Sequence, residues 1–400
     1  MLTTVNSHLN YMNENIDELV NIRRDIHQHP ELGFAEHRTS DLVARSLEQW
    51  GYSVTRGLGG TGVVGQLIRG DGKKKLGLRA DMDALPIDES TGLSYQSVNQ
   101  GVMHACGHDG HTAMLLAAAK YLAHEGQFDG TLNLIFQPAE EGLGGAISML
   151  NDGLFEKFPC DAIFACHNGP GIEVGHFHFR EGAMMASSDY ATITLTGVGG
   201  HGAHPHRCAD PIVAASSIVM ALQTIVSRNI DPLKMGVVTV GAIHSGVANN
   251  VIPATATLEL TLRALDKNVR QALEDRLRSI VHAQAESFGV TAAIDFRSGF
   301  AVLVNTPEET EFARKVAVKM FGEERVRGGA GQRSGSEDFA FMLEKCPGSY
   351  FIVGNGAGPA ACMVHNPGYD FNDETLPIGA AYWARLAEAF LSDNPDMVGI

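Results

Sequence analysis

The sequence predicts an α/β protein of two domains, a larger one with a mostly parallel sheet and a smaller α+β domain inserted into it. Two observations lead to this prediction. Apolar, strand-like segments alternate with helical patterns in both outer parts of the chain, as they do in parallel sheets covered by helices. The chain also has 400 residues, which is more than one compact core usually holds.

Five apolar segments of the outer parts predict buried strands, at residues 62–68, 75–81, 131–136, 161–166 and 349–353. Helical spacing of apolar residues is found at 111–124 and 378–391. In an open sheet of this kind, ligands gather beyond the carboxyl ends of the strands. The polar residues that follow these strands are therefore the first candidates for a functional site.

Near residue 188 the pattern changes to the order β-α-β-β-α-β. We expect strands at 191–196, 237–243, 255–262 and 291–296, and helices at 211–226 and 265–288. That order forms a ferredoxin-like unit, in which two helices cover one face of a four-stranded sheet. We therefore expect the larger domain at 1–187 and 299–400, and the inserted domain at 188–298.

The composition excludes several classes of protein. With 44% hydrophobic and 19% charged residues, the chain has the composition of an ordinary globular protein. A net charge of -16 without a Lys/Arg cluster argues against a nucleic-acid partner. We see no signal peptide and no apolar run that approaches a membrane span, so we expect no membrane partner. Six irregularly spaced cysteines predict a reducing compartment and a cytoplasmic protein.

The segment at residues 103–111, MHACGHDGH, is the strongest local signal of chemistry. Cys106 and His108 can turn toward one cation, because the glycine between them accepts dihedral angles that other residues avoid. Isolated cysteines and histidines are more often structural. The segment therefore needs partners elsewhere, and its remaining histidines, His104 and His111, are expected to flank the site or cap the following helix.

Three further motifs at the ends of predicted strands supply such partners. Glu140 and Glu141 follow the strand at 131–136, His167 follows that at 161–166, and His365 precedes the last helix. Adjacent acids repel each other, so a buried pair needs a cation, whereas a solvated turn is the alternative. From these residues alone, either glutamate could be the ligand.

With Cys106 and His108, the donor set becomes one thiolate, three imidazoles and a carboxylate. This set suits zinc or manganese and is poor for calcium or magnesium. It also exceeds what a single open catalytic metal normally takes, which predicts two metal ions.

Longer motifs make the chain similar to the hippurate hydrolases and related N-acyl-amino-acid amidohydrolases, of the dinuclear-metal aminoacylase and carboxypeptidase superfamily. The likeness covers nearly the whole chain and is carried by residues 23–33, 78–86, 103–111, 137–142, 200–203, 249–253, 335–339 and 365–373. It implies a metal-dependent hydrolase that cleaves N-acyl amino acids, hippurate-like or N-acetylated, to a carboxylic acid and a free amino acid. It also implies a catalytic larger domain and an inserted lid domain that forms a homodimer or homotetramer.

The resemblance assigns roles to residues. It implies two divalent ions, manganese or zinc with nickel or cobalt as alternatives, held by Cys106, His108, Glu141, His167 and His365. Glu140 would be the general base that activates a metal-bound water.

The resemblance also assigns residues outside the ligand set. His201 resembles the lid histidine that stabilises the tetrahedral oxyanion, including across a dimer interface. Asn250, by resemblance, and Arg263, by its charge, are candidates for binding the α-carboxylate of the substrate. Asp81 stands where the wider superfamily has a ligand histidine. Asp83 is therefore expected to orient a ligand, while structural and functional roles stay open for Asp81.

Other classes of function remain to be distinguished. One is a metal-dependent dipeptidase or carboxypeptidase, and another is a catalytically silent relative that binds its ligand through the metal. In a third, Cys106 is a nucleophile paired with a histidine, as in thiol hydrolases. Chelators would leave the activity of a thiol hydrolase intact, whereas thiol alkylation would abolish it.

Overall fold

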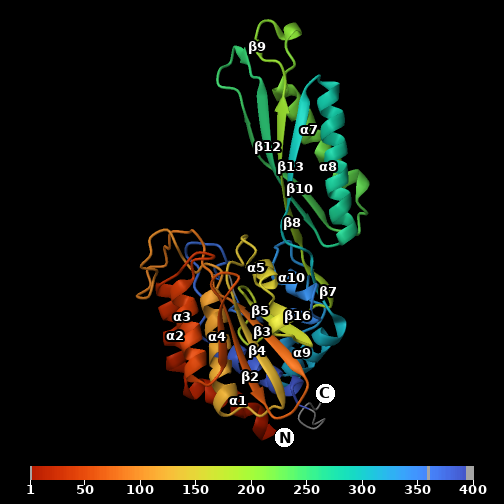
Figure 1. Ribbon diagram of the computed structural model, residues 1–400. Coiled ribbons are helices and arrows are strands. Elements are labelled where there is room, and N and C mark those ends of the chain that lie inside the picture. The colour runs from red at the N-terminus through yellow and green to blue at the C-terminus, as the bar shows by residue number, and fades with distance from the viewer. Residues whose placement is uncertain (1, 358–360, 393–400) are drawn as a thin grey trace. The chain divides into compact units, whose positions relative to one another are not determined.

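The computed structural model of the protein describes residues 2–357 and 361–392, which form two compact units (Figure 1). Unit 1 contains the chain up to Gly182, Val304–Gly331, and the residues from Asp338 onward. Unit 2 contains Ala183–Leu303 and Gln332–Glu337.

The borders of unit 2 are wider than the 188–298 expected for the inserted domain. The segment 332–337, which we expected in the larger domain, belongs to unit 2. Backbone hydrogen bonds explain this difference, because Arg333 and Gly335 bond to Met184 and Ala186 across a large separation in sequence. Pairing of this kind leaves no trace in the local hydrophobic pattern.

Unit 1 is built on an eight-stranded sheet of order β1-β2-β4-β3-β5-β16-β6-β15. Its strands are β1 (Ser53–Leu58), β2 (Gly62–Arg69), β3 (Lys75–Asp81), β4 (Gly130–Gln137), β5 (Ala162–Gly169), β6 (Phe177–His178), β15 (Val326–Arg327) and β16 (Gly348–Gly354). The central strands β4, β3, β5 and β16 are parallel, which confirms the predicted sheet. Strand β1 was not predicted, because Leu58 is its only buried residue.

Nine helices accompany this sheet in the described part of unit 1. They are α1 (Leu2–Glu14), α2 (Ile16–Gln28), α3 (His37–Gln49), α4 (His108–His124), α5 (Gly145–Asn151), α6 (Leu154–Lys157), α9 (Pro307–Phe321), α10 (Phe339–Leu343) and α11 (Thr375–Phe390). A short 3-10 turn, Glu323–Arg325, precedes β15.

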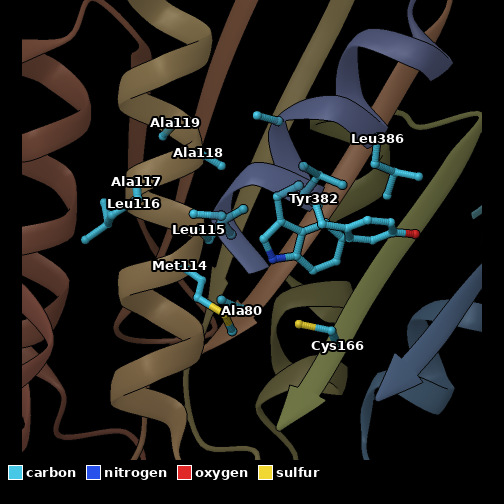
Figure 2. Close-up of a cluster of buried hydrophobic side chains, with 14 of the residues drawn as sticks. Ala80, Met114, Leu115, Leu116, Ala117, Ala118, Ala119, Cys166, Tyr382 and Leu386 are labelled. Atoms are coloured by element: carbon cyan, nitrogen blue, oxygen red, sulfur yellow. The ribbon is translucent and has the colours of Figure 1, made fainter. Parts of the chain in front are cut away.

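The core of unit 1 lies where α4 and α11 pack on each other and against β3. Figure 2 shows Met114 and Leu115 of α4 beside Tyr382 and Leu386 of α11. Both helices are apolar around most of their surface, as expected for helices buried between a sheet and other helices. This packing fixes the start of α4, and with it the segment 103–111, against the sheet.

Unit 2 has its own sheet, of order β10-β12-β8-β13, in which all pairs are antiparallel. Its elements follow the predicted order: β8 (Ser187–Thr196), α7 (Pro211–Thr224), β10 (Gly236–Ser245), β12 (Thr255–Ala264), α8 (Lys267–Ser287) and β13 (Thr291–Ser298). Short elements that were not predicted are β9 (Gly200–His201), a 3-10 turn at Pro205–Arg207, and β11 (Val251–Ile252), with β7 (Gly182–Met185) and β14 (Leu303–Asn305) near the unit borders. The ferredoxin-like order is confirmed, and the sheet and both helices share one apolar core.

Helix α7 continues into a π-helical turn, Ile225–Asn229. Together they are long and apolar enough to cross a membrane by length and composition alone. We expected no apolar run of this length. The segment carries a single charged residue, Arg228, while Ala214, Ile218 and Leu222 pack into the core of unit 2. Its apolar character thus has a source within the unit, because a helix against a sheet needs an apolar face.

Candidate metal centre

The carboxyl ends of three parallel strands define one edge of the sheet in unit 1. Strand β3 ends at Asp81, β4 ends at Gln137, and β5 ends at Gly169. Because these strands are parallel neighbours, the residues that follow them emerge side by side. One predicted position differs, since His167 lies inside β5 rather than after it, paired with Ile352 of β16.

The segment around Gly107 directs two donors to this edge. Gly107 precedes α4 with a φ of 91°, in the left-handed region that favours glycine. His108 begins the helix, and its Nδ1 lies 2.9 Å from the backbone oxygen of Asp83 and 3.2 Å from Asp83 Oδ1. Because a carbonyl oxygen only accepts, Nδ1 carries the hydrogen, and the lone pair of His108 is on Nε2.

His167 has the same arrangement. Its Nδ1 lies 2.7 Å from the backbone oxygen of Asn168, so Nδ1 donates and the Nε2 lone pair is exposed to the cluster. Nε2 lies 3.2 Å from Cys106 Sγ. Imidazoles whose Nδ1 is held by an oxygen acceptor while Nε2 stays open are typical of metal ligands.

The two glutamates follow β4 through Ala139, which has a positive φ of 53°. Two buried carboxylates hold this turn: Glu36 accepts a 2.8 Å hydrogen bond from the Ala139 N–H, and Asp83 Oδ2 accepts a 2.9 Å bond from the Glu141 N–H. Glu140 is buried and receives the N–H of Asp338 at 3.4 Å. A non-glycine residue in the left-handed region costs free energy, and such strain gathers at functional sites.

His365 reaches the cluster from a loop near the end of the chain. Its φ is 64°, and its backbone N–H donates to the oxygen of Ala105 at 2.7 Å. Its Nε2 lies 3.1 Å from Glu141 Oε1. This ion pair raises the pKa of His365. Burial raises the pKa of Glu141, but His365 and His108 outweigh that effect and lower it, so the carboxyl stays ionised.

The five predicted ligands are brought together. Two sets of donor atoms each lie within 4.8 Å of one another, namely Cys106-His108-His167 and Cys106-Glu141-His365. The sets share the sulfur of Cys106. A third set, His108-Glu140-Glu141, places Glu140 beside the donor atoms of His108 and Glu141.

The donor atoms fit a metal ion. Nε2 of His108 is fully buried and, within residues 2–357 and 361–392, has no hydrogen-bond partner of normal geometry. Burial lowers the pKa of His108, but Asp81, Cys106 and Asp83 outweigh it and raise the pKa, since negative charge collects around the ring. Positive charge is therefore favoured at this buried nitrogen, and a divalent cation would supply it in place of a proton.

Asp81 and His111, in contrast, are occupied with each other. His111 Nδ1 donates to Asp81 Oδ1 at 2.6 Å, and His111 Nε2 accepts the N–H of Asn168 at 3.0 Å. Asp81, His108 and His111 also lie within ligand distance of one another. Both ring nitrogens of His111 are used in hydrogen bonds, however. We therefore interpret Asp81 and His111 as a support for the neighbouring histidines. Of the two roles expected for His111, the position fits flanking the site and not capping the helix, because His111 lies inside the first turn of α4.

His104 flanks the cluster without joining it. The side chain is buried, and in the described part of the chain neither ring nitrogen has a hydrogen-bond partner. Burial lowers its pKa to about 4, so the ring is neutral at pH 7.

The remaining predicted residues belong to unit 2. His201 pairs with Val251 between β9 and β11, and Gly202 donates its N–H to the oxygen of Asn250 at 2.7 Å, so His201 and Asn250 lie close together.

Arg263 lies near the C-terminal end of β12, paired with Ser188. Thr255, at the N-terminal end of β12 that follows Asn250 in the chain, pairs with Thr196. Eight residues of strand separate the two ends by about 26 Å. The expectation that Asn250 and Arg263 bind the same carboxylate is therefore wrong within one chain. Arg263 instead bonds Thr261 and the Leu262 oxygen and lies over the ring of Tyr190.

A buried network behind the cluster was missed from the sequence. It contains Arg79 on β3, Gln137 at the end of β4, and Asp338 before α10, all nearly inaccessible to solvent. The available signal was a pair of charged residues, Arg79 and Asp81, that alternate with the apolar residues Leu78 and Ala80 near the end of β3. Buried charges of this kind need partners.

A parallel sheet whose carboxyl edge gathers thiol, imidazole and carboxylate donors around a buried glutamate defines an α/β metallohydrolase. The profile of peptidase family M20/M25/M40 matches residues 77–389. The chain belongs to this family.

Individual relatives are similar over nearly the full chain. A hippurate hydrolase of Campylobacter jejuni is 47% identical over 374 residues, covering 94% of this chain and 97% of that protein. Thermostable carboxypeptidase 1 of Saccharolobus solfataricus is 39% identical over 381 residues, covering 94% and 95%. Among solved structures, the YxeP protein of Bacillus subtilis, a dinuclear metal binding peptidase of the M20 family, has a TM-score of 0.81 at 33% identity and covers 95% of this chain and 99% of that chain.

Proposed function

We propose that the protein hydrolyses the amide bond of N-acyl amino acids, hippurate-like or N-acetylated, to a carboxylic acid and a free amino acid. The observation that carries the proposal is the convergence of five metal-donor side chains around the buried Glu140. Family membership and the likeness to a hippurate hydrolase over 94% of the chain support it.

The donors divide between two cations. Cys106, His108 and His167 would hold one ion, and Glu141 and His365, with Cys106 also in reach, the other. Thiolate and imidazole ligands favour manganese or zinc, with nickel or cobalt as alternatives. Asp83 would support both sides without binding metal, because it accepts hydrogen bonds from His108 and from the Glu141 backbone.

The bound ions would supply Lewis acidity and lower the pKa of water toward neutrality. Glu140 lies within ligand distance of His108 and Glu141, so its carboxylate is placed to take a proton from the attacking water and to return it to the departing amine. The N–H of Asp338 fixes one of its oxygens. Burial keeps bulk solvent away from this carboxylate and strengthens its interactions.

His201 of unit 2 would donate to the tetrahedral oxyanion, and Asn250 beside it would bind the substrate. His201 Nδ1 accepts the N–H of Ala203 at 3.0 Å, which leaves the hydrogen on Nε2. An N–H donor is the group that stabilises an oxyanion.

Unit 2 would also mediate association into a homodimer or homotetramer. Helix α7 leaves the apolar side chains of Ile212, Val213 and Met220 exposed, which supports this part of the proposal.

The test is a substrate panel with purified, metal-loaded protein. Acetyl, benzoyl and long-chain acyl amino acids of both chiralities are assayed with manganese, zinc, cobalt and nickel after the protein has been stripped of metal. We expect hydrolysis of at least one N-acyl amino acid. Glu140→Gln should lower kcat about 100- to 10,000-fold while metal content stays at the wild-type value. Full activity of this variant would contradict the role of Glu140.

Two other functions have specific support and are decided by the same panel. The similarity to a relative named as a carboxypeptidase supports a peptidase as the alternative, so dipeptides are included in the panel. Preferred hydrolysis of dipeptides would replace the N-acyl amino acid in the proposal. The 3.2 Å contact of Cys106 with His167 has the spacing of a thiol nucleophile and its base. That alternative leaves three donors unexplained, and burial raises the pKa of the Cys106 thiol. Activity that survives chelation would favour it.

A further inference from the structure

Arg79 is a buried cation within the central strand β3. Its side chain is inaccessible to solvent. Leu76, Leu78 and Ala80 point into the core formed with α4 and α11. Because side chains alternate along a strand, Arg79 points to the opposite face, where its guanidinium lies 5.6 Å from the ring of Phe339.

The guanidinium contacts groups from three separate parts of unit 1. Nη1 donates to Asp81 Oδ2 at 2.7 Å, Nε donates to Gln137 Oε1 at 2.8 Å, and Nη2 lies 3.4 Å from Asp338 Oδ1. Both carboxylates are buried. A planar fork of donors can serve three acceptors at once, which the single ammonium of lysine does less well.

One branch of this network leads to Glu140. The Asp338 carboxylate is fixed on both oxygens, since Oδ1 accepts from Gln137 at 2.7 Å and Oδ2 from the Ala146 N–H at 2.9 Å. The backbone N–H of Asp338 then donates to Glu140 Oε1. Arg79 thus neutralises and holds the residue whose peptide group orients Glu140.

The other branch leads to the histidines. Asp81 accepts from Arg79 on one oxygen and from His111 on the other. The His111 ring packs edge-on against His167 at 4.7 Å between centroids and lies 5.5 Å from His108. This branch supports the rings of two candidate ligands from behind.

We infer that Arg79 is a positioning residue for the hydrolytic reaction. Through Asp338 it supports the general base Glu140, and through Asp81 it supports the candidate metal ligands. The inference rests on the proposed function. It also gives a role to Asp81, left open by the sequence, which on this inference acts through His111. Arg79 is inaccessible to solvent and is not one of the candidate metal donors, so we expect its effect to fall on the rate of the reaction step more than on substrate binding.

The test compares Arg79→Lys with wild type on a substrate that wild type hydrolyses, N-benzoylglycine being the first tried. We expect kcat to fall at least about tenfold while KM changes less than about threefold, since a misplaced base weakens the transition state alone. Metal content per chain, measured after dialysis, should equal the wild-type value. The thermal transition of each variant is recorded to establish that it is folded.

Arg23→Lys is the matched control. Arg23 is also a fully buried arginine in unit 1, with carboxylate partners Asp109, Asp370 and Asp373. Its substitution should lower the thermal transition by a similar amount, and any loss of kcat should follow a loss of metal, because Arg23 supports the helix that carries His108 and not Glu140. An equal loss of kcat in both variants at wild-type metal content would mean that buried arginines matter through stability alone, and would overturn the inference.

A double substitution tests the path to Glu140. Asp338→Asn keeps the peptide N–H and the shape of the side chain, and it remains informative if Arg79→Lys does not fold. We expect Asp338→Asn to lower kcat with metal content retained. We also expect the double variant to lose less than the product of the two single losses, because both act through one contact.

Three outcomes would overturn the inference. One is a double variant whose loss of kcat equals the product of the two single losses. The others are an unchanged kcat for folded Arg79→Lys, and a loss of kcat that follows loss of metal. Absence of any wild-type turnover would contradict the proposed function and this inference with it. Wild-type turnover that Arg79→Lys does not change would contradict the role of Arg79 alone.

Discussion

Gly107 shows how strictly a single residue can be required by the cluster. Its φ of 91° is one that side chains rarely adopt, and a Cβ atom there would lie 2.3 Å from Asn168 Nδ2 and 2.7 Å from Tyr369 Oη. Neither neighbour is free to withdraw, because Asn168 donates to the Cys106 oxygen at 2.6 Å and Tyr369 donates to Asn168 at 2.7 Å. Backbone conformation and available space both require glycine between the two donors.

Gly107→Ala should therefore damage both stability and metal binding. We expect the free energy of unfolding to fall by about 2–5 kcal/mol, from the left-handed backbone and the overpacking together. Gly92→Ala is the control, because Gly92 has a φ of 70° but no atom lies within 4 Å of its Cβ position. Its free energy of unfolding should fall by about 1–2 kcal/mol, from the backbone alone. Urea unfolding and metal analysis measure the two effects. Equal losses in the two variants would contradict the steric argument.

At the scale of elements, a buried ion network ties α2 to α4 and to the loop before α11. Arg23 of α2 donates to Asp109 in the first turn of α4 at 2.8 Å and also pairs with Asp370 and Asp373. His27, one turn further along α2, lies 2.9 Å from Asp109. Burial lowers the pKa of His27, but hydrogen bonds to Asp109 and Glu89 outweigh it and raise the pKa to about 9. The network holds the helix that carries His108 in place.

Neighbouring arginines on α2 allow this network to be tested. Arg23→Met leaves Asp109 buried without its main cation, and we expect a loss of about 3–5 kcal/mol in the free energy of unfolding. Arg24 pairs with the same Asp373 at 2.7 Å, but its side chain is 42% exposed, so Arg24→Met should cost less than about 1 kcal/mol. Chemical denaturation of both variants at pH 7 provides the measurement. Losses of similar size would show that burial does not set the strength of the network.

On the scale of the whole molecule, the two units have separate apolar cores. All five candidate metal ligands and Glu140 belong to unit 1, whereas His201 and Asn250 belong to unit 2. A ligand that binds one folded unit stabilises that unit by mass action and leaves the other unchanged, unless their unfolding is coupled.

Scanning calorimetry should therefore show two transitions for the full chain. Addition of manganese or zinc to stripped protein should raise the temperature of the transition that belongs to unit 1 by several degrees and shift the other by less than about one degree. Glu141→Gln, which removes one ligand, should reduce the metal-dependent shift. A single transition, or an equal shift of both, would contradict independent unfolding of the two units.

Much of the architecture follows from local pattern, as single elements show. Strand β3 has the predicted bounds, Lys75–Asp81, and β16 begins and ends within one residue of its prediction, because buried parallel strands are short apolar runs between turn residues. Helix α4 begins three residues earlier than expected, since His108 and Asp109 are polar residues that the tertiary structure buries. The amphipathic helix α3 was not predicted, although its apolar face packs into the core of unit 1.

The sequence by itself determined the fold class, the order of elements and the donor residues, because these depend on periodicity and on which side chains bind metals. Only the tertiary structure decided which candidate donors lie within reach of one another and which polar residues stand behind them. It gave both nitrogens of His111 to hydrogen bonds, left Nε2 of His108 open, separated Asn250 from Arg263, and brought Asp338 to Glu140. These relations join residues distant in the chain. They depend on strand register and packing, which no local pattern encodes.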